Sequence, residues 1–225
     1  MQENINIKQI IITAGITLGF MAILVGAILA LNAIKSSGNK TGTASTPDQN
    51  SGDDMASMHA PPPPADDTIF KSLLGKPAPD FTLEAYDGRR ISLKDLKGKN
   101  VVIFFTEGAM CYPSCWDQMV AFSKEPKFNN DKTVVLSIVV DPRSDWAEAV
   151  KQMPQLSSST VLLDIDRNIS LTYGALTLTS SMHRGQFPGH TYIIVDKEGI
   201  VRYLLDDEYM QIRNKELLKE LDKLS

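Results

Sequence analysis

Apolar and polar residues alternate in blocks along most of the chain after residue 69, and these blocks predict strands and helices in turn. Two apolar-rich runs within Phe81–Leu93 flank Asp87-Gly88, a pattern typical of a β-hairpin. Apolar runs of strand length predict further strands at Val101–Thr106, Thr133–Val140, Val161–Leu163, Thr191–Asp196 and Ile200–Leu205. Helices are expected at Pro113–Phe122, Asp145–Met153, Ile169–Leu176 and Asn214–Leu224. Alternation of strands and helices predicts an α/β layered sheet.

The longest apolar stretch of the chain is residues 9–34, which contain no charged residue and no histidine. About 20 apolar residues in a helix span the bilayer core. A cleaved signal peptide is the alternative, with an apolar region of roughly 7–15 residues and a small-x-small cleavage site. Leu31-Asn32-Ala33 places a large residue at that site. We therefore expect an N-terminal tail at residues 1–8 and a single transmembrane anchor at residues 9–34.

Residues 35–68 are dominated by Gly, Ser, Thr, Asp and Pro, and large aliphatic residues are almost absent. Such a segment cannot bury enough apolar surface to offset its chain entropy, which predicts a disordered linker before a domain at residues 69–225. The chain has 23 basic and 27 acidic residues and a net charge of −4. This balance gives no broad basic face, so nucleic acid is not an expected partner.

The chain has two cysteines, Cys111 and Cys115, four positions apart. A structural disulfide usually closes a longer loop, so we interpret this pair as chemical. The pair follows the strand Val101–Thr106, at the sheet edge where α/β proteins place reaction sites. The start of the next helix stabilises a thiolate, and the spacing allows the two sulfurs to bridge. Because disulfides persist outside the cytoplasm, we expect the domain on the outer side of the cell membrane.

Two further side chains are candidates for auxiliary roles. Glu107 lies at the end of the strand before the cysteines and can help proton transfer, or it can be a solvated loop carboxylate. His190 precedes the strand Thr191–Asp196, which we expect beside the cysteine loop. A histidine there can donate to a thiolate, move a proton, bind a metal or serve only the structure.

The segment GKPAPDFTLEAYDGRRISLKDLKGKNVVIFF resembles the opening of the peroxiredoxin, or AhpC/TSA-like redoxin, branch of the thioredoxin superfamily. The similarity continues through SIVVDPRSD and HTYIIVDKEGIVRY, over about residues 74–205. It implies a thioredoxin-like fold, with a central mixed sheet flanked by helices and an N-terminal β-hairpin extension.

Three branches of this superfamily share parts of the cysteine motif. Peroxiredoxins use Pro-x-x-x-Thr-x-x-Cys, and aligning Cys115 to that cysteine puts Tyr112 in the place of the threonine. Reductases of cytochrome maturation use Cys-x-x-Cys, one residue shorter than the spacing here. Sco-type copper-assembly proteins use Cys-x-x-x-Cys with a histidine before the later strand, and Cys111, Cys115 and His190 are similar to that triad.

We therefore expect a membrane-anchored, extracytoplasmic thiol–disulfide oxidoreductase that needs no cofactor. Cys111 and Cys115 would be its catalytic residues, and its substrate a protein thiol or disulfide, or a peroxide. In peroxide reduction, Cys115 would form the sulfenate and Cys111 would resolve it. The alternative is a Sco-type chaperone that binds copper through Cys111, Cys115 and His190.

Overall fold

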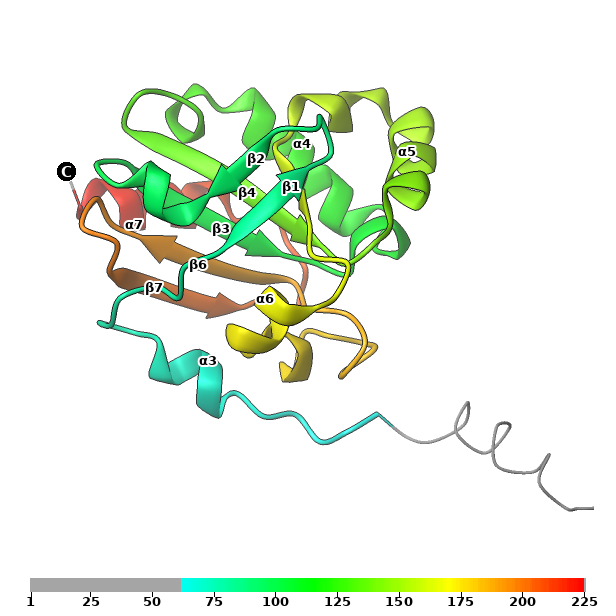
Figure 1. Cartoon of the computed structure of the whole chain (residues 1–225), viewed down its shortest axis with the longest axis horizontal. Helices are drawn as coiled ribbons and strands as arrows, with labels where there is room; N and C mark the ends of the chain where they lie inside the picture. Colours follow the sequence, from blue (N-terminus) through cyan, green and yellow to red (C-terminus); the bar gives the residue numbers. More distant parts are fainter. Residues whose placement is uncertain (1–61, 225) are drawn as a thin grey trace, which may run out of the picture. The chain divides into compact units, whose positions relative to one another are not determined.

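The computed structural model describes residues 62–224 as one mixed sheet with helices on both faces (Figure 1). The strands are β1 (Thr82–Ala85), β2 (Arg90–Ser92), β3 (Asn100–Phe105), β4 (Thr133–Val139), β5 (Val161–Leu163), β6 (Thr191–Val195) and β7 (Val201–Asp206). The α-helices are α3 (Thr68–Ser72), α4 (Ser114–Lys124), α5 (Arg143–Gln152), α6 (Asn168–Thr172) and α7 (Asn214–Asp222). The 3-10 helices are η1 (Leu93–Leu96), η2 (Gly108–Met110), η3 (Pro126–Phe128), η4 (Pro154–Ser158) and η5 (Ala175–Thr177).

The sheet has the strand order β2-β1-β5-β4-β3-β6-β7. Strand β3 lies near its centre, parallel to β4 and antiparallel to β6. In the β3–β6 register, Phe105 faces Thr191 and Val101 faces Val195. The carboxyl end of β3 therefore lies beside the first residue of β6. This pairing brings the segment after β3 next to the segment before β6.

The core consists of two apolar clusters, one on each face of the sheet. Successive side chains of a strand point to opposite faces. In β3, Phe104 joins the cluster with α4, α5 and α7, whereas Ile103 and Phe105 join the cluster with α3. Figure 1 shows α4 and α5 on the side of the sheet away from α3 and α6. Every residue of β3 is buried, and the strand is apolar from Val101 to Phe105, as expected of a central strand.

The predicted α/β layered sheet and its order of elements are confirmed, with boundaries that differ by one or two residues for most elements. The helix expected at Ile169–Leu176 is instead two short pieces, α6 and η5. They are separated by Gly174, whose φ of 69° lies in the left-handed region. A Cβ there would come within 2.9 Å of the Phe70 backbone nitrogen, so the break in the helix accompanies the packing of α3.

The end of the predicted linker contacts the domain. Helix α3 begins at Thr68, one residue before the expected domain start. Asp66 and Thr177 exchange two hydrogen bonds, and Arg184 donates to the Pro63 carbonyl. Residues 63–68 are therefore not a free spacer, because their backbone groups find partners on the domain.

The predicted tail, the anchor at residues 9–34 and the linker up to residue 61 lie outside the described residues. Within residues 62–224, no helix has the length and apolar character needed to cross a bilayer.

Candidate active site

Cys111 and Cys115 lie where β3 has ended and α4 begins, as their sequence position predicts. Cys111 follows η2, and Cys115 is the second residue of α4. The backbone N–H of Cys115 donates to the Cys111 carbonyl at 3.0 Å, which forms a tight turn between them. The two side chains are joined by a disulfide, with Cα atoms 5.4 Å apart. That separation lies within the ordinary range for a disulfide.

His190 lies against the same pair, because β6 starts beside the end of β3. Its Nδ1 atom is 3.3 Å from the Cys115 Sγ atom. One ligand atom from each of Cys111, Cys115 and His190 falls within 4.8 Å of the others, and all three residues are buried. The structure thus brings together the three residues that the Cys-x-x-x-Cys plus histidine pattern singles out.

The imidazole of His190 is fully buried and neutral at physiological pH. Burial lowers its pKa to about 4, and the nearby Asp207 carboxylate opposes this shift only in part. The other ring nitrogen, Nε2, lies 2.7 Å from the Tyr192 hydroxyl. That hydroxyl also contacts Gln118 Oε1 at 3.0 Å. The sulfur of Cys115 is therefore the start of a buried chain of polar groups.

Tyr192 and Gln118 were not identified from the sequence as members of the site. A signal existed for Tyr192, since residues two apart on a strand share a face and His190 had already been singled out. Gln118 lies in the middle of α4, and its importance depends on partners that are 74 or more residues away in the chain.

Glu107 is a buried carboxylate, so its interpretation as a solvated loop residue is wrong. It accepts the backbone N–H groups of Met182 and His183 at 2.6 and 3.1 Å, and the Ser181 hydroxyl is 3.4 Å away. None of its hydrogen bonds in residues 62–224 goes to a cysteine or to His190. The side chain instead holds the 181–183 segment against the end of β3. Such charge-assisted bonds to backbone N–H groups are among the stronger hydrogen bonds in proteins.

Gly108 and Asp141 fix the backbone just before Cys111, and neither was identified from the sequence as part of the site. Gly108 has a φ of 67°, and a Cβ there would lie 1.7 Å from Asp141 Oδ2. Its carbonyl accepts the Trp116 Nε1–H at 3.1 Å. Asp141 Oδ2 accepts the Ala109 N–H, and burial raises the Asp141 pKa to about 6. A residue larger than glycine does not fit between these contacts.

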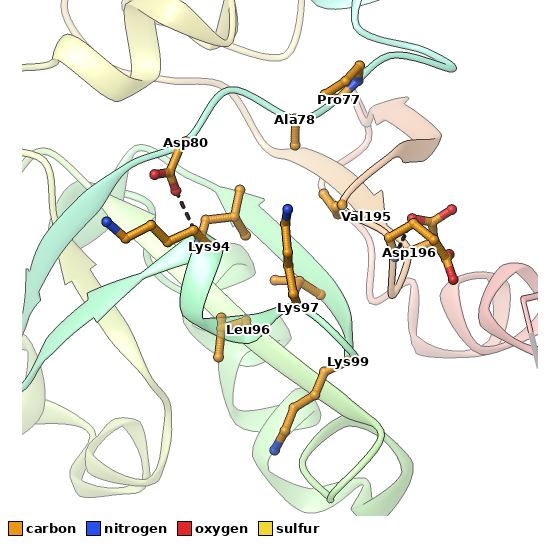
Figure 2. Close-up of a pocket in the computed structure, with 13 residues that line it drawn as sticks. Pro77, Ala78, Asp80, Lys94, Leu96, Lys97, Lys99, Val195 and Asp196 are labelled. Atoms are coloured by element: carbon orange, nitrogen blue, oxygen red, sulfur yellow. Dashed lines mark hydrogen bonds between the residues drawn. The ribbon is translucent and has the colours of Figure 1, made fainter.

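A separate hollow of about 310 Å³ lies at the other end of β3 and β6 (Figure 2). Val101 and Val195 form part of its apolar wall, and three lysines are among the residues that line it. In Figure 2 the Lys94 backbone N–H donates to Asp80, and this bond closes one side of the hollow. Phe105 and Thr191 mark the cysteine end of the same strand pair, about 13 Å along the strands from Val101 and Val195, so the hollow and the disulfide lie at opposite ends of this pair. It is not part of the cysteine site.

Residues 74–204 match the model of the AhpC/TSA family. Peroxiredoxin Q of Oryza sativa subsp. japonica, a chloroplastic protein, is 30% identical over 152 residues, which are 67% of this chain and 67% of that protein. The solved structure of the reduced 2-Cys peroxiredoxin of Plasmodium vivax matches with a TM-score of 0.55 and 26% identity. That match covers 67% of this chain and 95% of the other. The structure of Enterococcus faecalis AhpC matches with a TM-score of 0.58 at 18% identity, over 67% and 91% of the two chains, and supports the thioredoxin-like fold alone.

Proposed function

This chain belongs to the AhpC/TSA family of peroxiredoxin-like thiol peroxidases and oxidoreductases, and on that premise we propose that Cys111 and Cys115 cycle between dithiol and disulfide. The observation that carries the proposal is their disulfide at the start of α4, with a buried imidazole nitrogen 3.3 Å from Cys115 Sγ. A bridge that closes so short a loop adds little to stability, which favours a chemical role.

The exposure of the residues around the pair indicates which of the two sulfurs a partner thiolate attacks. Cys115 is fully buried and Cys111 is 4% exposed, but Cys111 is flanked by Met110 and Tyr112, which are 48% and 63% exposed. We therefore assign Cys111 as the sulfur attacked by a partner thiolate. The S–S bond breaks, its electron pair goes to Cys115 Sγ, and a mixed disulfide forms at Cys111. The partner's second thiol then attacks that mixed disulfide, so the partner is oxidised to a disulfide and the pair is reduced.

The helix supports this assignment, because the positive end of the α4 dipole and its free N–H groups stabilise the departing Cys115 thiolate. In the reverse sequence, the reduced pair of this chain attacks a partner disulfide, so the partner is reduced to a dithiol and the Cys111–Cys115 disulfide forms. The reduction potential of the pair decides the direction that operates.

Thiol counting before and after mild reduction tests the cycle. We expect no free thiol in the oxidised protein and two after reduction, with recovery of the disulfide on adding oxidant. Cys115→Ser, treated with the small disulfide of a monothiol, should accumulate a mixed disulfide at Cys111, because Cys111 is left without its resolving partner. The matched Cys111→Ser variant should trap far less. Two free thiols that do not respond to oxidant would refute the proposal.

Peroxide reduction is the family activity that the same pair could perform. In this reaction Cys115 thiolate attacks the peroxide, the O–O bond breaks, and an alcohol or water leaves as Cys115 becomes a sulfenate. Cys111 then displaces water to form the disulfide. Tyr112 stands where peroxiredoxins have threonine, so peroxide turnover needs a direct test. Loss of peroxide should depend on Cys115, and a sulfenate trap should label Cys115 in the Cys111→Ser variant. No peroxide loss above that of the Cys115→Ser variant would exclude this activity.

We further propose that residues 9–34 anchor the chain in the cell membrane with the domain outside the cytoplasm. The support is the uncharged apolar stretch and the disulfide, which persists in oxidising compartments. A membrane-impermeant thiol reagent applied to intact cells after mild reduction should label Cys111. Labelling only after lysis would place the domain on the inner side, and recovery of the chain without membranes would refute the anchor.

Metal binding is the second candidate function, because Cys111, Cys115 and His190 offer two sulfurs and one imidazole within 4.8 Å. Thiolate and imidazole ligands suit copper, so the donor set fits Cu(I) chemically. Copper bound there would be the cargo of a chaperone. We expect the reduced protein to bind one copper ion and His190→Ala to bind it more weakly while still forming the disulfide. Equal copper affinity in the wild type and His190→Ala would exclude this site.

A further inference from the structure

A buried chain of hydrogen bonds runs from Cys115 through α4 to the start of α7. The Cys115 sulfur contacts His190 Nδ1 at 3.3 Å, and His190 Nε2 contacts the Tyr192 hydroxyl at 2.7 Å. The hydroxyl contacts Gln118 Oε1, and Gln118 Nε2 donates to Asn214 Oδ1 at 2.9 Å. From His190 to Asn214 each contact pairs a donor with an acceptor, so the position of one proton determines the next.

Two backbone groups fix the direction of this chain at its far end. Asn214 Nδ2 lies 2.9 Å from the Ala121 carbonyl, which can only accept, so the Asn214 oxygen must face Gln118. Gln118 then presents its NH₂ group to Asn214 and its oxygen to the other side. There the backbone N–H of Arg213, which can only donate, meets Gln118 Oε1 at 2.7 Å. Both amide orientations are therefore set by backbone atoms.

The Tyr192 hydroxyl has one proton and, within residues 62–224, three hydrogen-bonding neighbours. Two of them, Gln118 Oε1 at 3.0 Å and the Gln211 carbonyl at 3.3 Å, are oxygens that only accept. The hydroxyl proton must point to one of these oxygens, since otherwise buried oxygen atoms would face one another with no proton between them. The hydroxyl oxygen then accepts a hydrogen bond from its third neighbour, His190 Nε2.

We propose that Tyr192 and Gln118 are positioning residues that hold neutral His190 with its proton on Nε2 and the lone pair of Nδ1 directed at Cys115. In the oxidised pair this lone pair faces the disulfide. When an external dithiol reduces the pair, two electrons and two protons are added, and the Cys115 S–H donates to Nδ1. Neutral His190 is thereby a hydrogen-bond acceptor for the Cys115 thiol and cannot donate to that sulfur.

The low pKa of His190 agrees with a single ring proton, but the assignment rests on the hydrogen-bond directions. The tautomer does not depend on the proposed function. The consequence for Cys115 chemistry does rest on that function.

The ring-nitrogen chemical shifts of the oxidised full chain, labelled with ¹⁵N-histidine, test the assignment directly. His190→Ala identifies the His190 signals by their loss. We expect a protonated Nε2 and an unprotonated Nδ1 between pH 6 and pH 8. In Tyr192→Phe the acceptor for Nε2–H is gone, so both nitrogens should shift towards values averaged between the two tautomers.

Tyr173→Phe is the matched control, because Tyr173 is also fully buried and its hydroxyl donates to the Pro79 carbonyl at 2.6 Å. It removes one buried hydroxyl elsewhere in the core and should leave the His190 shifts unchanged. Gln118→Met provides a second variant should Tyr192→Phe fail to fold, and it should also move the His190 shifts towards averaging.

A proton on Nδ1 in the wild type would overturn the inference, and so would His190 shifts that neither Tyr192→Phe nor Gln118→Met alters. The two proposals fail separately. A protonated Nε2 in a protein whose cysteines show no reversible chemistry would refute the redox function and leave the tautomer standing. Reversible disulfide chemistry with the proton on Nδ1 would do the opposite.

Discussion

Asp141 carries a buried carboxyl group that should destabilise the fold at neutral pH. Its side chain is at the carboxyl end of β4, the residue is 7% exposed, and no ion pair with it occurs in residues 62–224. It accepts a hydrogen bond from the Ala109 N–H at 3.1 Å. Loss of water around the carboxylate raises its pKa from 3.8 to about 6, against the effect of that hydrogen bond.

The pH dependence of this contribution has a definite sign. Between pH 3.8 and about 6 the folded protein keeps a proton that the unfolded chain has lost. The favourable contribution of the protonated group is therefore fully present below pH 3.8 and is lost as the pH rises through 6. Each pH unit in this window corresponds to about 1.36 kcal/mol, which gives a loss of about 3 kcal/mol above pH 7.

Asp141→Asn removes the ionisation and keeps an oxygen that can accept from Ala109. Urea unfolding, followed by the fluorescence of the buried Trp116 and Trp146, should show the variant to be more stable by about 2–3 kcal/mol at pH 7.5. The difference should vanish near pH 4. Asp131→Asn, which changes an exposed carboxylate before β4, should alter stability by no more than about 0.5 kcal/mol. A variant that is no more stable at pH 7.5, or a gain that is the same at both pH values, would refute this explanation.

Three other changes test neighbouring parts of the structure by the same unfolding measurement. Gly108→Ala should lower the free energy of unfolding by more than about 3 kcal/mol, because its Cβ would clash with the buried Asp141 carboxylate and its φ is unfavourable for alanine. Gly88→Ala, with a φ of 91° but open space around its Cβ, should lower it by about 1–2 kcal/mol. Equal costs would refute the clash. Glu107→Ala should lower the free energy of unfolding by about 2–3 kcal/mol and expose the 181–183 segment to proteases, since two backbone N–H groups lose their acceptor. The control Glu125→Ala removes an exposed acceptor and should have neither effect. The neutral, buried His190 makes its full contribution to stability above pH 6.5, and about 3 kcal/mol of that contribution is lost as the pH falls to about 4. The His190→Gln variant should therefore lose less stability than the wild type over that pH window. An identical loss in the two proteins would contradict its burial in the neutral form.

The fold could be predicted from the sequence where burial alone determines the residue type. Strand β3 is buried along its whole length, so its apolar run located the strand to within one residue. Helix α3 could not be found in this way, because its five residues bury only Phe70 and its position depends on the break at Gly174. A short element of this kind is determined by its neighbours rather than by its own periodicity.

The candidate site, too, could be predicted from the sequence only in part. The spacing of Cys111 and Cys115 is local, so it predicted their proximity, and the expected strand order placed His190 beside them. The direction of the His190 proton depends on the contact of Tyr192 with Gln118, which is 74 residues away in the chain, and on amide orientations set by backbone groups of Arg213 and Ala121. Sequence patterns contain no information on such orientations.

The redox and metal functions proposed for the pair are exclusive states of the same two sulfurs. In the disulfide each sulfur is bonded to the other, and neither has the thiolate charge that a metal ligand needs. Reduction of the pair must therefore precede any metal binding, and a bound metal would in turn protect the thiolates from oxidation. The unprotonated His190 Nδ1 suits both functions, since it can accept a hydrogen bond from the Cys115 thiol or ligate a metal without first losing a proton of its own. The buried polar chain behind His190 consequently favours neither function over the other, and metal binding competes with re-formation of the disulfide only while the pair is reduced.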